Sequence, residues 1–260
     1  MENGKLVVEV LGSSPKSLEM PLNVRNHDET AGQSISVIVP VYNESAGVGG
    51  LLRFLSPLRE QCEIIFVDGG SSDDTAKTIG DRGFTVVSSP QKGRAYQMNH
   101  GASLSGGDIL WFLHADSLPP DGALTHIRDV LGSGYEIGCF PMRFDSIHPL
   151  LLIISFLSNN LRTRKRNIAF GDQGIFLQRW LFEEVGGYAA IPLFEDYQLS
   201  LDITKNGLKF GMAKKKITTS ARRYREHGRT RTMLRMWWLQ IRFTRGDDIE
   251  EIARAYIGDR

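Results

Sequence analysis

Cysteine is scarce in this chain, and no apolar run is long enough to cross a membrane. The 260 residues include two cysteines, Cys62 and Cys139, which are too few for a disulfide framework and favour a reducing compartment. Residues 1–33 are polar and lack the apolar core of a signal peptide, so we expect a loosely held extension. The most apolar run, Pro149–Leu157, has about half of the roughly 20 residues that a membrane span needs. We therefore expect a cytoplasmic protein, with this run buried in the core or lying at a membrane surface.

Two familiar phosphate-binding motifs are also missing. No G-x-G-x-x-G follows the first apolar strand, which argues against a dinucleotide-dependent dehydrogenase. A metal-dependent nucleotidyltransferase, the main alternative among enzymes, would carry a Gly-rich phosphate loop at the same place. The sequence there is Tyr42-Asn-Glu-Ser45 instead.

The formal net charge is only +1, which argues against a nucleic-acid coat. This total hides an uneven distribution. Residues 205–245 hold thirteen Lys and Arg and one acid, Glu226, so this segment carries +12 and the rest of the chain −11. A nucleotide- or nucleic-acid-binding module built on the basic segment is a second alternative, and it predicts affinity that falls steeply with salt.

Apolar strands alternate with helical segments in the first half of the chain. The expected strands are 36–41, 63–68, 84–88 and 108–113, with helices over 48–58, through Ile79 and through Gly101. This alternation predicts an α/β fold with a mostly parallel sheet that is covered by helices on both faces. Ligands of such sheets bind beyond the carboxyl ends of the strands.

The pattern changes after Asp116. We expect a strand over 138–144, a helix over 149–161, a basic loop over 162–167, a short strand over 174–177, a helix over 180–185, a helix from Glu195 to about Lys205 and one or two helices over 229–256. The last segment is amphipathic and aromatic.

Acidic residues follow three of the predicted strands. Glu44, Asp68 and Asp116 come after the first, second and fourth strands. Parallel strands bring these ends to one edge, where clustered carboxylates repel each other and so indicate a cation or a polar ligand. Turn and helix-cap chemistry is the alternative for Glu44 and Asp68.

Six motifs occur in an order that resembles the family 2 glycosyltransferases of GT-A fold. They are Val39–Glu44, Val67–Thr75, Lys92-Gly-Arg94 with Asn99–Ala102, His114-Ala-Asp116, Gly171–Gly174, and Gly186-Gly-Tyr188 with Glu195-Asp196. The segments Pro192–Asp196 and Thr219–Arg223 are similar to the bacterial arsenosugar-biosynthesis-type subgroup. The resemblance implies a Rossmann-like nucleotide-diphospho-sugar transferase fold with a helical C-terminal extension.

The resemblance covers about residues 34–225 and implies a division of the chain. The expected parts are an N-terminal extension (1–33), a catalytic domain (34–225) and a helical C-terminal segment (226–260). Within the catalytic domain, 34–117 would bind the nucleotide and 118–225 the acceptor.

The resemblance also assigns residues to the donor. It implies that the nucleoside is held by Pro40, Tyr42, Glu44 and Asp68. A carboxylate suits this task because it accepts charge-assisted hydrogen bonds from an imide N–H or from ribose hydroxyls. Lys92 and Arg94 are implied near the base or the diphosphate, with a solvated loop pair as the alternative.

Asp116 matches the last residue of the family's Asp-x-Asp metal motif. The implied cofactor is a divalent ion, Mg²⁺ or Mn²⁺, which prefers carboxylate oxygen and leaves positions open for phosphates. His114 stands where many relatives have Asp, and we expect it to contact the donor; a packed strand-end histidine is the alternative. His227 is a further candidate metal ligand.

Asp196 matches the family's catalytic base. An inverting transfer needs a carboxylate beside the acceptor hydroxyl, opposite the leaving diphosphate, and a rigid helix start such as Glu195-Asp196 would fix that geometry. The alternative is that the pair only favours the helix N-terminus electrostatically. Asp172 is expected to help bind donor or acceptor.

The basic segment has two interpretations. In the family, an Arg- or His-containing loop often covers the diphosphate, and Arg222, Arg223, Arg225 or His227 would do so here. Alternatively, the cationic and aromatic C-terminal surface lies on anionic lipid at the inner face of a membrane, or it is a solvated face with aromatics packed in the core. The predicted activity is an inverting, hexosyltransferase-like transfer from a nucleotide-sugar donor, first a UDP-sugar, to a hydroxyl acceptor that is a small molecule, a glycan or lipid-linked. We expect no nucleic-acid partner, and a homo-oligomer is a further expectation.

Overall fold

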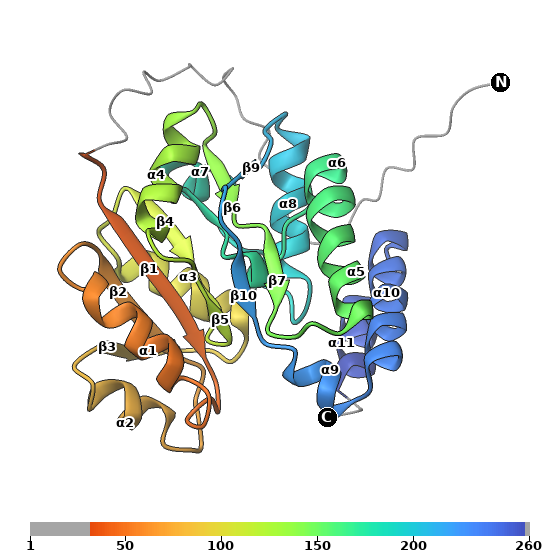
Figure 1. The fold of residues 1–260 in the computed structure, drawn as a ribbon, viewed down its shortest axis with the longest axis horizontal. Helices are drawn as coiled ribbons and strands as arrows, with labels where there is room; N and C mark the ends of the chain where they lie inside the picture. The colour runs from red at the N-terminus through yellow and green to blue at the C-terminus, as the bar shows by residue number, and fades with distance from the viewer. Residues whose placement is uncertain (1–31, 258–260) are drawn as a thin grey trace.

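Seven strands form the central sheet of the computed structural model, which describes residues 32–257 (Figure 1). All but the last two residues of the predicted N-terminal extension lie outside the described residues. The strand order is β3 (Thr85–Ser88), β2 (Glu63–Asp68), β1 (Ile35–Val41), β4 (Ile109–Phe112), β8 (Phe176–Gln178), β6 (Ile137–Cys139) and β9 (Gly211–Met212). Only β8 runs antiparallel to its neighbours, so the mostly parallel α/β sheet is confirmed.

Helices cover both faces of this sheet because the central strands are buried on both sides. Every residue of β1 is buried, which explains its continuous apolar sequence. One face packs against α1 (Gly49–Leu55), α2 (Thr75–Gly80) and α4 (Ala123–Gly132). The other packs against α3 (Arg94–Leu104), α7 (Arg179–Glu184) and α8 (Glu195–Lys205).

A second, smaller sheet and a group of helices complete the fold. The small sheet has the order β5 (Ser117–Leu118), β10 (Ile217–Thr219) and β7 (Met142–Phe144). The helices are α5 (Pro149–Leu157) with its π-helical continuation Ser158–Thr163, α6 (Arg164–Arg166), α9 (Arg222–Glu226), α10 (Arg229–Arg245) and α11 (Ile249–Ile257). Two helices over the C-terminal segment are thus confirmed. The division at residue 225 stays a prediction, and α9 runs across it.

Two predicted elements were wrong. Residues 138–144 are not one strand: the chain leaves the large sheet as β6 and enters the small sheet as β7, with Phe140-Pro141 between them. Pro141 has no backbone N–H for a sheet ladder, which favours a break there. The predicted basic loop over 162–167 is helical up to Arg166. Asn167 ends it with a left-handed φ of 59°, and basic residues suit the last turn of a helix.

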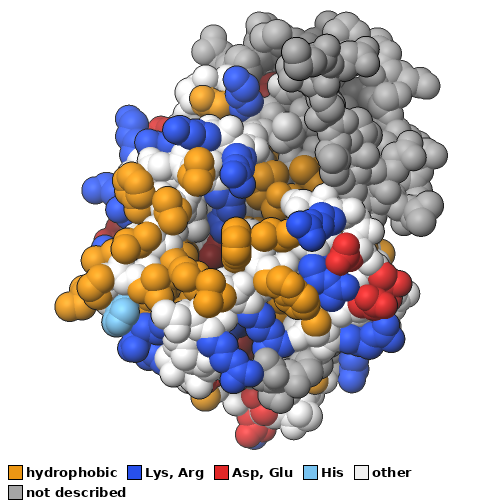
Figure 2. Space-filling view, turned by 90° about the vertical axis from the view of Figure 1, so that its right-hand side faces the viewer, with side chains coloured by type: hydrophobic (Ala, Val, Ile, Leu, Met, Phe, Trp, Pro, Cys, Tyr) orange, Lys and Arg blue, Asp and Glu red, His pale blue; other side chains and the backbone are white. Residues whose placement is uncertain are grey.

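The side of the molecule formed by α5 and α10 exposes many hydrophobic side chains (Figure 2). Within residues 32–257, however, no helix has both the length and the apolar composition that a membrane span requires.

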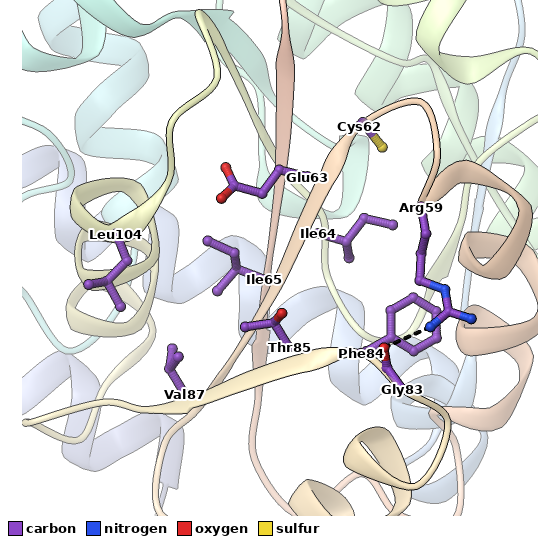
Figure 3. A pocket seen from close by; sticks show the side chains of 10 residues that line it. All are labelled: Arg59, Cys62, Glu63, Ile64, Ile65, Gly83, Phe84, Thr85, Val87 and Leu104. Carbon is purple, nitrogen blue, oxygen red and sulfur yellow. Dashed lines mark hydrogen bonds between the residues drawn. The ribbon is translucent and has the colours of Figure 1, made fainter.

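A cavity of about 450 Å³ opens at the amino-terminal ends of β2 and β3 (Figure 3). Arg59 spans its rim, donating to the Gly83 carbonyl at 2.7 Å with its guanidinium 4.7 Å from the centre of the Phe84 ring. None of the predicted site residues lines it. The cavity therefore lies at the strand ends opposite to those where the acidic motifs stand.

Gln97 of α3 fixes the carboxyl ends of β1 and β2. Its buried side-chain amide donates to the Val41 carbonyl at 2.8 Å and to the Val67 carbonyl at 2.7 Å. These are the places where the two strands turn into the motif-bearing loops. The amide therefore ties together the two loops that follow.

Replacing Gln97 should destabilise the fold. Gln97→Leu removes both side-chain hydrogen bonds and leaves Val41 O with the Gly69 N–H at 2.9 Å, so we expect the free energy of unfolding to fall by about 1–3 kcal/mol in urea titrations. The matched control is Gln61→Leu, which removes an exposed amide that donates to Pro57 O at 3.3 Å and should change stability by less than about 0.5 kcal/mol. Similar losses in both variants would contradict the role of Gln97.

Candidate active site

Two loops at the carboxyl ends of β1 and β2 are joined into one surface. Asn43 adopts a left-handed φ of 52°, which Asn tolerates better than most residues. Its backbone N–H donates to Ser71 Oγ at 2.9 Å, and its side-chain oxygen accepts from the Ser72 N–H at 2.9 Å. The Glu44 N–H donates to Thr75 Oγ1 at 2.8 Å. The first two sequence motifs therefore hold each other in place.

Asp68 ends β2, and its carboxylate accepts hydrogen bonds from the turn that follows the strand. Oδ2 accepts from the N–H groups of Gly70 and Ser71, each at 3.0 Å, and Ser71 Oγ donates to Oδ1. The turn role named as the alternative is thus observed, and a contact with the nucleoside stays a prediction. Pro40 lies within β1, and Tyr42 exposes 48% of its surface beside the same edge.

Glu44 is paired with Arg222 across the site. The guanidinium meets the carboxylate at 2.7 Å and 3.1 Å, in a two-bond arrangement. This pair joins the loop after β1 to the segment after β10. A contact of Arg222 with a diphosphate stays a prediction that requires this pair to open. Lys92 is exposed near Gly70, where an added Cβ would lie 3.8 Å from the lysine Cε.

Asp116 lies within a group of charged side chains from several motifs. Its side chain is open to solvent, while the protein around it desolvates the carboxylate and raises its pKa. The carboxylates of Glu44 and Asp172 raise this pKa further, and Arg94 and Arg223 oppose them. The structure therefore brings together residues that the sequence placed far apart.

Glu195 and Asp196 begin α8 as buried neighbours, 3% and 5% exposed. Asp196 Oδ2 accepts from the Gly171 N–H at 2.8 Å, and Glu195 Oε1 accepts from Arg94 at 3.3 Å. The amino terminus of a helix also favours negative charge. The pair is thus held by a turn, by α3 and by its own helix.

Gly171 lets His114 and Asp196 approach the same stretch of backbone. A Cβ at this position would overlap His114 Nε2 and would lie 2.8 Å from Asp196 Oδ2. Burial lowers the pKa of His114 well below its usual value, and the cations Arg94 and Arg223 lower it further. The imidazole is therefore neutral, and it lies beside the Asp196 carboxylate.

Burial also raises the pKa values of the Asp196 and Asp172 carboxyl groups. Desolvation, and then the adjacent Glu195 carboxylate, raise the pKa of Asp196 to about 8, against the opposing effects of Arg94 and the Gly171 N–H. Desolvation likewise raises the pKa of Asp172, while Arg162 and Arg223 oppose it. A carboxylate with a pKa near neutrality is suited to accept a proton from a substrate.

Three buried polar atoms of this group have no hydrogen-bond partner within the described part of the chain. They are Asp196 Oδ1, Asp172 Oδ1 and His114 Nε2. Buried polar atoms in folded proteins are nearly always paired. Their gathering beside Asp116 indicates a site that is completed by a polar ligand.

Sequence reasoning missed three residues of this site. The Arg162 guanidinium stacks on Phe170 at 4.0 Å, donates to Gln173 at 3.0 Å and approaches Asp172 to 4.0 Å. Tyr256 of α11 lies 5.2 Å from the Arg223 guanidinium. Gln173 stands in a motif and could have been found, whereas Arg162 and Tyr256 reach the site only through tertiary folding.

The comparison with protein families decides what kind of site this is. The family model described as glycosyl transferase family 2 matches residues 36–186, more than half of the chain. The chain belongs to glycosyltransferase family 2. The match includes the motifs from Val39 to Gly186, and the base candidates Glu195 and Asp196 lie just beyond it.

Named relatives have different substrates. The chain is 30% identical over 161 residues to the undecaprenyl-phosphate 4-deoxy-4-formamido-L-arabinose transferase of Klebsiella pneumoniae, covering 57% of this chain and 49% of that protein. It is 32% identical over 101 residues to the glucosyl-3-phosphoglycerate synthase of Mycolicibacterium smegmatis, covering 35% of this chain and 33% of that protein. The chain thus spans about half the length, or less, of these curated relatives.

Solved structures confirm the GT-A fold. The glucosyl-3-phosphoglycerate synthase of Mycobacterium tuberculosis, in complex with Mn²⁺, UDP and glucosyl-3-phosphoglycerate, superposes with a TM-score of 0.52 at 20% identity, covering 74% of this chain and 71% of that one. TarS residues 1–349 of S. aureus superposes with a TM-score of 0.59 at 15% identity, covering 72% and 60%. At these identities the likeness concerns the fold alone.

His227 and Arg225 are not gathered with the acidic group. His227 is exposed where α9 ends, and Arg225 pairs with Asp145 at 3.0 Å. Within residues 32–257, no three His, Cys, Asp or Glu side chains stand close enough to hold a metal by themselves. The role of His227 as a metal ligand stays a prediction, as does the arsenosugar-type subgroup.

The raised pKa of Asp196 should make the folded protein less stable as the pH rises. The folded state keeps a proton on Asp196 up to about pH 8, whereas the unfolded chain loses it near pH 4. The stabilisation that this bound proton gives is fully present below the pKa of Asp196 in the unfolded chain. It is lost as the pH rises through the pKa in the folded state, by up to about 1.4 kcal/mol per pH unit.

Urea unfolding of the ligand-free protein between pH 5 and 9 checks this expectation. Asp196→Asn should flatten the decline, and the exposed Asp121→Asn should keep the wild-type decline. Parallel curves for wild type and Asp196→Asn would show that Asp196 has an ordinary pKa.

Proposed function

We propose that this chain transfers a sugar from a nucleotide-diphospho-sugar, first a UDP-sugar, to an acceptor hydroxyl with inversion at the anomeric carbon. The observation that carries the proposal is Asp196. It is buried, one carboxylate oxygen is held by the Gly171 N–H, and the other has no hydrogen-bond partner among residues 32–257. Once it is deprotonated, a carboxylate that is fixed through one oxygen and free at the other can receive the acceptor's proton at the free oxygen.

A divalent ion, Mg²⁺ or Mn²⁺, fits the site if the donor supplies some of its ligands. Such ions often take one or two protein carboxylates and complete their shell with water and substrate phosphates. Asp116 is open to solvent, and Asp172 Oδ1, which accepts no hydrogen bond from the described residues, belongs to the same charged group. Asp116 would therefore hold the ion together with the diphosphate. Bound there, the ion would supply positive charge against the charge that grows on the leaving group.

The transfer needs one proton movement by this chain. Asp196 Oδ1 would take the proton of the acceptor hydroxyl as the hydroxyl oxygen attacks the anomeric carbon. The bond from that carbon to the diphosphate oxygen breaks on the opposite face, and a nucleoside diphosphate leaves. Arg223 and Arg94 lie where they would offset its negative charge, while Glu195 keeps Arg94 in place.

The remaining assignments concern the partners. The nucleoside would be bordered by Pro40, Tyr42, Glu44 and Asp68. The sugars would be bordered by His114 and Asp172. The relatives are named for a lipid phosphate and for phosphoglycerate, so acceptors of both chemistries occur in the family. For this chain we propose a hydroxyl acceptor, a cytoplasmic location at the inner face of a membrane, and self-association as a further expectation.

Asp196→Asn should abolish turnover and spare binding. Asn keeps the size of the side chain and an oxygen for the Gly171 N–H but no longer takes a proton, so turnover should fall by about 10²–10⁴-fold. Release of UDP from UDP-sugars measures turnover, and calorimetry with UDP measures binding, which should stay within a few-fold. The control is Asp202→Asn on the same helix. Undiminished turnover in Asp196→Asn would remove its assignment as the base.

Asp116→Asn should weaken metal-dependent binding of the donor. With Mn²⁺ present, UDP should stabilise the wild type against thermal unfolding, because ligands that bind the folded state raise its stability. We expect the variant to need at least about tenfold more UDP for the same shift, and EDTA should abolish the difference. Parallel screens with GDP and dTDP identify the nucleobase that the protein prefers. Equal UDP affinity with and without EDTA in the wild type would contradict a metal at Asp116.

A further inference from the structure

Two neighbouring helices turn large hydrophobic side chains toward solvent on one side of the molecule. We call this set the outer face; it comprises Leu152, Ile153, Phe156 and Leu157 of α5 and Leu234, Trp237 and Trp238 of α10. Phe156 and Trp237 expose 64% and 63% of their surface. The seven residues are more than half of the thirteen large hydrophobics exposed in residues 32–257. Hydrophobic residues gathered in this way mark an interaction site.

The helix α5 exposes more large apolar side chains than it buries. Its buried residues are Leu151 and Ser155, and the π-helical turn that follows buries Ser158 and Asn159. Asn159 binds the backbone of Met142 through both of its side-chain atoms, at 2.8 Å and 2.9 Å. A helix that covers a core in water normally shows the reverse pattern. The exposed apolar stripe of α5 is therefore suited to a partner that is less polar than water.

The helix α10 continues this surface. Leu234, Trp237 and Trp238 are three and four residues apart, a spacing that places them on one stripe. Its opposite side is also apolar, with Leu239 and Phe243 buried in a cluster that includes Leu193, Phe194 and Ile252. The helices α5 and α10 are in contact, so the two exposed stripes form one surface. Tryptophan is typical of the boundary between lipid and water.

Basic side chains lie at several places around the outer face, and acidic side chains lie to its right and below it (Figure 2). Residues 146–171 and 227–246 contain no Asp or Glu. The same two segments contain nine basic residues: Arg162, Arg164, Lys165, Arg166, Arg229, Arg231, Arg235, Arg242 and Arg245. Arg162 points into the site, and Arg242 pairs with Asp247 and Glu251 of the neighbouring helix segment. The exposed Arg164, Lys165, Arg166, Arg229 and Arg245 contribute positive charge near these apolar side chains, which is complementary to anionic headgroups above an acyl layer.

We propose that the outer face docks onto an anionic lipid bilayer, with α5 and α10 lying in the interfacial plane. A second copy of the chain is a poorer occupant. A two-fold dimer would place this face against itself, and the basic residues near the face of one copy would then meet those of the other. An anionic bilayer satisfies the apolar stripe and these basic residues together.

Docking would bring the bilayer close to the candidate active site. The inner side of α10 places Phe243 5.2 Å from Phe194, the residue directly before Glu195. The neighbouring α11 carries Tyr256, which lies over Arg223. A membrane-borne acceptor would therefore meet the site near α10 and α11. This last consequence rests on the proposed function, whereas the docking does not.

Flotation with lipid vesicles tests the docking. The full chain, without donor or metal, is mixed with vesicles of phosphatidylcholine alone or of equal parts phosphatidylcholine and phosphatidylglycerol. We expect the protein to float with the anionic vesicles at low salt, to stay behind with neutral ones, and to show a blue shift of tryptophan emission on binding. Failure to bind the anionic vesicles, or equal binding to both kinds, would overturn the proposal.

Matched variants locate the surface. Phe156→Ser should weaken vesicle binding by about tenfold, and Leu104→Ser, an exposed leucine at the end of α3, should leave it unchanged. Arg164→Glu with Lys165→Glu should weaken it by about tenfold or more, and Lys77→Glu with Arg82→Glu on and beside α2 should have a much smaller effect. Thermal unfolding confirms that each variant is folded. Equal losses in the test and control variants would overturn the assignment to the outer face.

Two further measurements separate the outcomes. Sedimentation equilibrium without lipid should give the same oligomeric state for the wild type and Phe156→Ser; a dimer that Phe156→Ser dissociates would overturn the proposal by assigning the outer face to a second copy. UDP-dependent thermal stabilisation, measured without vesicles, reports on the proposed function alone. A protein that floats with the vesicles but is not stabilised by UDP would support the docking and contradict the proposed function. A protein that is stabilised by UDP but does not float would support the proposed function and contradict the docking.

Discussion

The burial of two adjacent carboxylates constrains most of this structure. Glu195 and Asp196 are nearly inaccessible to water at the start of α8, and a buried charge is costly unless it is paired or neutralised. The fold supplies Arg94 from α3, the Gly171 N–H from a turn and the amino terminus of α8 itself. Compensation is incomplete, because the pKa of Asp196 remains raised to about 8. The imbalance that makes the pair costly to fold also makes Asp196 a good proton acceptor.

The C-terminal helices contribute to the same geometry. Phe194, directly before the pair, has a left-handed φ of 64°, which is unusual for a bulky residue and costs about 1–3 kcal/mol. Its ring packs against Phe243 of α10, and both are buried in one apolar cluster with Leu193 and Ile252. The strained backbone that aims Glu195 and Asp196 is therefore supported by residues beyond 225. The helical extension suggested by the sequence is structurally part of the site.

Local signals made the sheet and much of the site predictable. The strand β2 was predicted with its observed ends, because an apolar run stops at Asp68 and a Gly-rich turn follows. The acids at the strand ends gather because parallel strands share an edge. The break between β6 and β7 was not foreseen, because it depends on pairing with two different sheets. Arg162 and Tyr256 were missed for a related reason, since helix packing alone brings them to Asp172 and Arg223.

The uneven charge of the chain gains a physical meaning from its placement in space. The segment with a charge of +12 includes α10, which carries arginines as well as Trp237 and Trp238. In the folded chain this segment also meets the acidic motifs, because Arg222 pairs with Glu44. On the docking we propose, an anionic bilayer attracts the basic residues near the outer face, so electrostatics favours the orientation in which this face meets the lipid. The apolar stripes of α5 and α10 would then anchor the molecule, because charge attraction acts at a distance whereas hydrophobic burial requires contact.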